Sequence, residues 1–226
     1  MRYNWAGDII VRDTIVSNKR AVVGYKDKLI PTDIREWIRG PENENLSKAL
    51  SEINGLPKEK TAGSFDERAI LIWEYVAKKI TYVHDKEAHG MVDMWMFPEE
   101  VLALGKGDCE DSANALCSLL LASGISPFCV RVVLGTVYDS QGKLLGGHAW
   151  GVYLDEMGSW RLLESTLDKL PDGMPLADDL TKSRRDFIYK PSLCFNRQHL
   201  WQIEPVPLDI KGYLELQRFK VGFSLE

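Results

Sequence analysis

The chain has 226 residues, of which 45% are hydrophobic and seven are Trp, enough for one large domain, or one domain with extensions, around a substantial core. Its formal net charge of −5 argues against nucleic-acid binding as the main function. It contains no apolar run of the ~18–20 residues needed to span a membrane and no signal-peptide core at its start.

The cysteines favour a reducing, cytoplasmic setting. Four cysteines in a chain of this length do not suggest a disulfide scaffold, and the Cys109, Cys117 and Cys129 spacings match no zinc template. Cys117, Cys129 and Cys194 are expected to be small buried hydrophobes.

The first part of the chain is predicted to be an extension. Residues 1–60 carry one short strand, residues 8–12, and two short helices near residues 32–38 and 47–53. We expect this extension to pack on the core of a main domain formed by residues 61–226.

A helix that begins near Cys109 is the most informative feature of the main domain. Asp108 suits the N-cap position, and Asp111 could complete a pair that resembles a capping box. Cys109 would then lie in the first helical turn, where the positive end of the helix dipole favours thiolate over thiol. Gly124 is a natural helix stop. The core-facing stripe of this helix has helical spacing: Ala113, Leu116, Cys117, Leu120 and Leu121.

A histidine and an acid follow on two predicted strands. Residues 144–154 and 160–164 read as strands joined by a five-residue loop. That loop length sets Leu154 opposite Trp160 and makes His148 and Glu164 diagonal neighbours on one face. With further strands between residues 128 and 166, the sequence predicts an antiparallel sheet packed on helices, an α+β fold.

Two blocks around the cysteine resemble a known family. Residues 95–102 (WMFPEEVL) and 105–113 (GKGDCEDSA) resemble the transglutaminase-like superfamily of papain-type cysteine enzymes, and most closely its bacterial cysteine proteinases. Residues 147–150 (GHAW) and 163–166 (LEST) match the family's second and third blocks. The likeness spans roughly residues 64 to 168, and it implies a papain/transglutaminase-like core with the nucleophile on a helix.

The resemblance implies a Cys109-His148-Glu164 catalytic triad. Cys109 would attack an amide carbonyl, His148 would hold and return the proton, and Glu164 would orient the imidazolium. The family usually has Asp at the third position, so Asp168 is a competing candidate. Trp95 could supply an indole N–H to the oxyanion or form a wall of the cleft.

Three functions are compatible with these residues. A cysteine peptidase or amidase would pass the acyl group to water, and a transamidase would pass it to an amine. A binding module could keep the fold without catalysis. The expected partner is a protein or peptide substrate, whereas the sequence does not address the oligomeric state.

The chemistry requires no cofactor, although the resemblance permits calcium beside the cysteine. Asp108, Glu110 and Asp111 offer the carboxylate oxygens that calcium prefers, but helix capping and solvation also explain them. We expect these acids to point outward and to be screened by water, so that contact with the His148 imidazolium controls the thiol pKa.

Overall fold

The computed structural model describes residues 2–3, 9–10, 20–22, 25–30, 33–59, 61–90, 93–177, 187–203 and 205–206. Its helices are α1 (Glu44–Ser51), α2 (Ser64–Lys79), α3 (Asp85–Ala88), α4 (Pro98–Leu104) and α5 (Cys109–Ala122), with the 3-10 turns η1 (Ile34–Trp37) and η2 (Pro127–Cys129). Its strands are β1 (Arg2–Tyr3), β2 (Ile9–Ile10), β3 (Arg20–Val22), β4 (Tyr25–Ile30), β5 (Thr81–Tyr82), β6 (Lys106–Gly107), β7 (Val130–Asp139), β8 (Leu144–Leu154), β9 (Trp160–Leu163), β10 (Phe187–Phe195), β11 (Leu200–Gln202) and β12 (Pro205–Val206).

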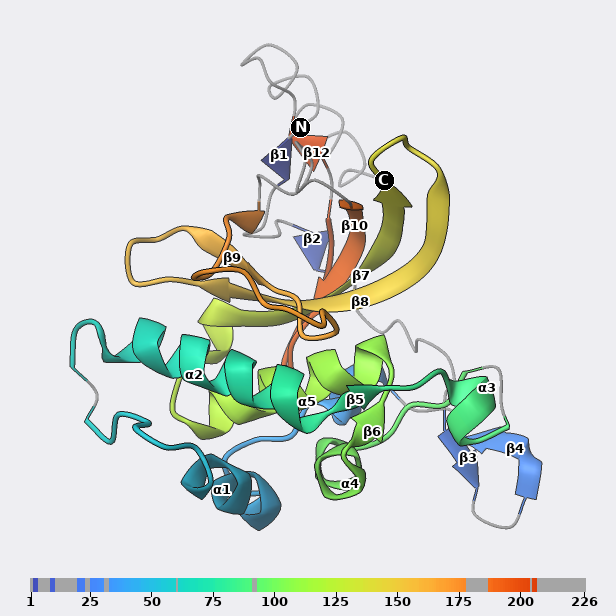
Figure 1. The fold of residues 1–226 in the computed structure, drawn as a ribbon, viewed down its shortest axis with the longest axis horizontal. Helices are drawn as coiled ribbons and strands as arrows, with labels where there is room; N and C mark the ends of the chain where they lie inside the picture. The colour runs from blue at the N-terminus through green and yellow to red at the C-terminus, as the bar shows by residue number, and fades with distance from the viewer. Residues whose placement is uncertain are drawn as a thin grey trace, which may run out of the picture.

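A six-stranded sheet is the centre of the fold. Its strand order is β2-β11-β10-β7-β8-β9, and every neighbouring pair is antiparallel. Helices α2 and α5 cover one face of this sheet, and α1 and α4 lie beyond them (Figure 1). The predicted α+β class, with the cysteine-bearing helix packed on an antiparallel sheet, is therefore confirmed.

Helix α5 is buried on all sides because it lies between the sheet and the other helices. The predicted apolar stripe is buried as expected, but so are all the residues from Glu110 to Leu121. The helix ends as predicted, since Gly124 has a φ of 93° and the Ile125 N–H donates to the Leu120 carbonyl at 3.2 Å. The buried helix therefore holds the residue at its N-terminus in a fixed position.

The β8–β9 hairpin has the predicted register. Leu154 pairs with Trp160, and Gly151 pairs with Leu163. One further step along this register brings Trp150 opposite Glu164, so the side chains of His148 and Glu164 project from the same face. The five-residue loop therefore determines that the histidine and the acid can meet.

The segment that precedes the main domain shares its core. Trp37 and Leu46 are fully buried and belong to the same apolar cluster as the α5 side chains. The helix expected at residues 32–38 is the shorter 3-10 turn η1, and the helix expected at residues 47–53 begins earlier, at Glu44, with Asn43 as its N-cap. The boundary at residues 60 and 61 stays a prediction.

In the part of the chain that the structure describes, none of the helices combines the length and the apolar character required to cross a membrane.

A glycine in the central sheet provides a test of the packing. A Cβ on Gly135 of β7 would lie 2.2 Å from the Lys190 carbonyl oxygen and 2.8 Å from the Trp150 ring, so Gly135→Ala should destabilise the fold by about 1–3 kcal/mol. A Cβ on Gly147 of β8 would meet nothing within 4 Å. Gly147→Ala should therefore leave the free energy of unfolding in urea within about 0.5 kcal/mol of the wild type. Equal midpoints for the two variants would contradict this packing.

Candidate active site

Cys109 is held at the first position of α5 by the strand that precedes it. Strand β6 pairs in parallel with β5 and leads through Asp108, the N-cap, directly into the helix. A Cβ on Gly107 would lie 2.7 Å from the Val101 side chain and 2.8 Å from Asp111. Glycine therefore allows the chain to turn closely into the helix and places Cys109 beside the sheet.

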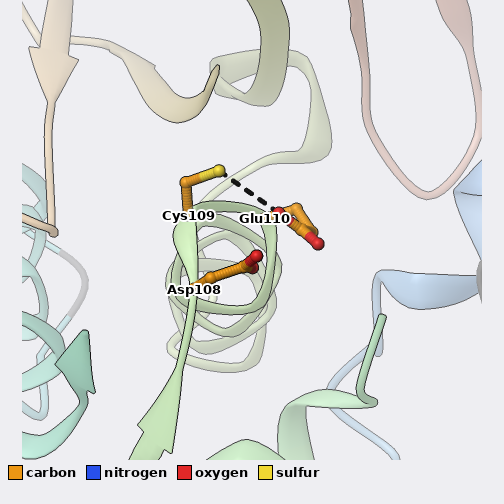
Figure 2. Close-up of side chains that lie close together, drawn as sticks. All are labelled: Asp108, Cys109 and Glu110. Atoms are coloured by element: carbon orange, nitrogen blue, oxygen red, sulfur yellow. Dashed lines mark hydrogen bonds between the residues drawn. The ribbon is translucent and has the colours of Figure 1, made fainter. Parts of the chain in front are cut away.

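The sulfur of Cys109 lies between a carboxylate and the edge of β8. Its Sγ donates to Glu110 Oε2 at 3.2 Å, as Figure 2 shows. Burial and the neighbouring acids raise the pKa of the thiol, and the backbone N–H of Ala149, which is directed at the sulfur, opposes part of that rise. Ala149 directly follows His148, so the strand that carries the histidine passes beside the Cys109 sulfur.

His148 and Glu164 form a short hydrogen bond inside the protein. His148 Nε2 and Glu164 Oε2 are 2.6 Å apart, and Glu164 is only 1% exposed. Burial alone would raise the pKa of Glu164, but the charge and hydrogen bond of His148 and the bonds from Thr166 hold that pKa below its usual value. The carboxyl group is therefore ionised, and Nε2 is the nitrogen that donates to it.

Three residues that the sequence analysis did not select position this pair. Thr166 donates to Glu164 Oε1 through its backbone N–H at 2.9 Å and through its hydroxyl at 2.7 Å. Tyr189 donates its hydroxyl to Glu164 Oε2 at 3.2 Å, and Trp73 donates its indole N–H to the Glu164 carbonyl at 2.8 Å. Because Nε2 of His148 is engaged, Nδ1 is the ring nitrogen left to exchange a proton with a thiol.

The other predicted site residues lie in different surroundings. Asp168 is exposed and lines a surface hollow with Lys78 and Ser165, whereas Glu164 is the acid that contacts His148. Trp95 is buried, with its ring 5.4 Å from Trp37 and 6.4 Å from Phe195. Its part in an oxyanion site stays a prediction.

The acids beside Cys109 do not point outward, so that expectation was wrong. Glu110 is 7% exposed and Asp111 is fully buried, because the helix end is enclosed by α3, α4 and their connections. Asp108 makes no capping bond through its side chain, and Asp111 Oδ1 accepts from the Met96 N–H at 2.7 Å instead. Burial, followed by the charges of Glu110 and Asp108, raises the pKa of the Cys109 thiol.

Two further carboxylates join these acids in one cluster. Asp108, Glu110 and Asp111 lie close to Asp85 on α3 and to Asp93. Within each of the groups Asp85-Asp93-Glu110 and Asp85-Asp108-Asp111, the carboxylate oxygens lie within 4.8 Å of one another. The sequence analysis missed Asp85 and Asp93, since no spacing relates them to the cysteine motif.

The cluster has the properties of a site for a hard divalent cation. Burial raises the pKa of Asp85 to about 6, of Asp111 to about 8 and of Glu110 to about 10, and the neighbouring acids add to each shift. Among the described residues, nothing donates a hydrogen bond to the buried oxygens Asp108 Oδ1 and Asp111 Oδ2. Carboxylate oxygens with this need for positive charge fit calcium better than softer metals.

The fold defines a class of protein: a papain-type arrangement, in which a helix with a cysteine at its N-terminus packs on an antiparallel sheet that carries a bonded histidine and acid. The family model described as the transglutaminase-like superfamily matches residues 52–165, half of the 226-residue chain. The chain belongs to this superfamily.

Solved structures share the fold, and one relative shares part of the sequence. LapG of Legionella pneumophila has a similar fold: its EGTA-treated form has a TM-score of 0.51 at 20% identity, covering 75% of this chain and 81% of LapG. The calcium-bound form has a TM-score of 0.50 at 19% identity, covering 83% and 95%. The mouse centrosomal protein of 76 kDa is 37% identical over 97 residues, which are 39% of this chain and 13% of that protein.

The carboxylate cluster predicts an unusual pH dependence of stability. Folding raises the pKa of Asp85, Asp111 and Glu110 above the ordinary 3.8 to 4.5, so the folded state binds more protons than the unfolded state between about pH 5 and 9. Without divalent cations, the free energy of unfolding should therefore fall as the pH rises through this window. Urea unfolding at several pH values measures it, and added calcium should reduce the fall.

Glu110→Gln is the matched control for this titration, because it keeps the size of the side chain and removes the group with the highest pKa. The variant should lose less stability than the wild type at the alkaline end of the window. A wild-type profile that is flat or rises with pH would contradict the titration of the cluster.

Proposed function

We propose that this chain is a cysteine peptidase or amidase in which Cys109, His148 and Glu164 transfer an acyl group to water. The observation that carries the proposal is the 2.6 Å bond between His148 and Glu164, one residue before the Ala149 N–H that points at the sulfur. Membership of the transglutaminase-like superfamily and the sequence likeness to its bacterial cysteine proteinases support it.

The reaction begins at the sulfur. Cys109 passes its proton to Nδ1 of His148, and the thiolate attacks the amide carbonyl carbon to form a C–S bond. Glu164 stabilises the imidazolium through Nε2. The C–N bond then breaks as His148 returns the proton to the leaving amine. Water, deprotonated by His148, attacks the thioester carbon; the C–S bond breaks, the acid leaves, and the Cys109 thiolate takes the proton back from His148.

The developing oxyanion needs hydrogen-bond donors near the sulfur. The backbone N–H of Cys109, at the positive end of the α5 dipole, is the first donor that we propose. Trp95 is the second candidate, as an indole N–H donor or as a wall of the cleft.

Calcium is the cation that we propose for the carboxylate cluster, because LapG has been solved in a calcium-bound form and the oxygens here suit it. Asp85, Asp93, Asp108, Glu110 and Asp111 would hold it. When bound, calcium would supply positive charge that offsets the carboxylates near the thiol. Glu110 links the two sites, since it accepts from the sulfur and belongs to the cluster.

A catalytically silent binding module is a second candidate that one observation favours. The Cys109 thiol donates to Glu110, and its raised pKa opposes formation of the thiolate that catalysis needs. A protein or peptide substrate and a cytoplasmic location remain predictions from the sequence.

Substitutions at the three positions test the catalytic roles. With calcium present, Cys109→Ala and His148→Ala should each abolish hydrolysis of a fluorogenic peptide library. Glu164→Gln should retain about a hundredfold more activity than Cys109→Ala, because orienting the base contributes less than providing it. Initial rates measure each loss, and circular dichroism verifies that the fold is kept.

Asp168→Asn is the matched control, since it removes the competing carboxyl from an exposed position. Its rate should equal that of the wild type. If Asp168→Asn were inactive while Glu164→Gln had full activity, Asp168 rather than Glu164 would be the acid that orients the imidazolium.

The acceptor of the acyl group separates a hydrolase from a transamidase. We expect a peptide substrate to yield free acid even when a dansylated primary amine is added in excess, because water resolves the thioester. Mass spectrometry of the products measures this. A dansyl-amide product that requires Cys109 would instead identify a transamidase.

A further inference from the structure

A pocket of about 310 Å³ opens beside the proposed catalytic histidine. It lies between the first half of β8 and the segment that follows β5. His148 and Thr166 are among its lining residues, so it adjoins the bonded pair His148 and Glu164. Most of the remaining walls are apolar or aromatic: Tyr82, Val137, Leu145, Leu167, Phe187 and Tyr189.

The edge of β8 that faces this pocket has no strand beside it. Strand β9 covers β8 only from Gly151 to Leu154, and within the described ranges no strand pairs with the outer edge of β8 between residues 144 and 150. The Ala149 N–H points outward from this edge, at the Cys109 sulfur. Residues two apart on a strand direct their backbone groups to the same side, so the N–H and C=O of Gly147 also face outward.

Two glycines form the part of this edge that is nearest to His148. A Cβ on Gly147 would meet nothing within 4 Å, so packing within the described chain does not require glycine there. Gly146 has a φ of 155°, a conformation that L side chains rarely adopt, so its own backbone accounts for glycine at that position. Glycine inside a strand weakens the strand and often marks the close approach of a ligand or of another backbone. These glycines leave the edge accessible to an extended chain.

The pocket suits one uncharged side chain. Among the described residues that line it, none is Asp, Glu, Lys or Arg, and the two ionisable side chains with a cationic form are His84 and His148. A positively charged group inside the pocket would therefore lack a countercharge. Its volume is at the lower end for ligand pockets, which suits a side chain rather than a cofactor. Tyr82, Leu145 and Phe187 are 41%, 51% and 37% exposed, and a bound apolar group would cover them.

We propose that this pocket is the subsite for a bulky apolar side chain of an extended peptide substrate, whose backbone pairs with the open edge of β8 at Gly147. Backbone pairing along a sheet edge gives affinity, and a pocket for one side chain gives specificity. The inference rests on the proposed function, because it assigns the substrate class of the same site.

Three alkylating probes of the full chain, with calcium present, test this subsite. Iodoacetamide reports the reactivity of the thiol alone. Ac-Ala-Ala-Phe and Ac-Ala-Ala-Gly chloromethyl ketones add a peptide backbone with and without a large side chain. In each chloromethyl ketone reaction, the Cys109 sulfur forms a bond to the chloromethyl carbon, chloride leaves and the thiol proton is lost to solvent. Mass spectrometry measures the labelling rate, with Cys109→Ala as the blank.

The Phe probe should label Cys109 about tenfold or more faster than the Gly probe, as expected for filling an apolar pocket. Leu145→Asp should abolish most of this preference when each chloromethyl ketone rate is divided by the iodoacetamide rate of the same variant. Leu144→Asp is the matched control: Leu144 is 54% exposed and is not among the residues that line the pocket, so the preference should persist. N-methylation of at least one probe amide should slow the Phe probe by a similar factor, because it removes a donor for the Gly147 carbonyl.

The outcomes separate this inference from the proposed function. Equal Phe and Gly rates, or a preference that Leu145→Asp does not change, would overturn the subsite even if iodoacetamide labelling depends on His148. A preference for Phe that persists while the iodoacetamide rate is the same in His148→Ala would support the subsite and overturn the catalytic role of His148.

Discussion

The bond between His148 and Glu164 is the interaction on which the site depends. Glu164 is enclosed by the protein, and its ionised form is tolerated because His148, Thr166 and Tyr189 donate to its two oxygens. A buried charge with this many partners is stable only in one geometry. The donors come from β8, from the segment after β9 and from β10, so the buried carboxylate is satisfied only when these parts of the sheet keep one alignment. The same bond fixes the imidazole ring so that Nδ1 is directed away from the acid.

The exclusion of water has the opposite effect at the N-terminal end of α5, where it favours the uncharged forms of the thiol and the acids. Asp108 and Glu110 lie beside the sulfur and belong to a cluster with three further carboxyl groups. Four of the five have a raised pKa because water is excluded. In this arrangement the helix dipole and the Ala149 N–H favour the thiolate, whereas Glu110 accepts the thiol proton in a hydrogen bond and favours the thiol. Positive charge in the carboxylate cluster would shift this balance toward thiolate, so the cluster and the nucleophile act as one electrostatic unit.

The sequence predicted the parts of the site that follow from local pattern. The helix of Cys109 and the register of the β8–β9 hairpin depend on residue spacing, and a five-residue loop was enough to bring His148 and Glu164 onto one face. The burial of Glu110 and Asp111 was not predictable in this way, because it results from α3 and α4 packing around the helix end. Asp85, Asp93, Tyr189 and Trp73 reach the site through tertiary packing, across gaps that carry no periodic signal.

The shortness of β9 relates catalysis to substrate binding. Because β9 pairs with only the last four residues of β8, the remaining edge of β8 presents the Ala149 N–H to the sulfur and the Gly147 backbone to the proposed substrate. A longer β9 would have satisfied these groups within the sheet and closed the pocket beside Tyr82 and Phe187. An unpaired edge is ordinarily a hazard for aggregation. Tyr82 of β5 lines the same pocket as Gly147, and in our proposal the open edge is where an extended peptide binds in line with the nucleophile.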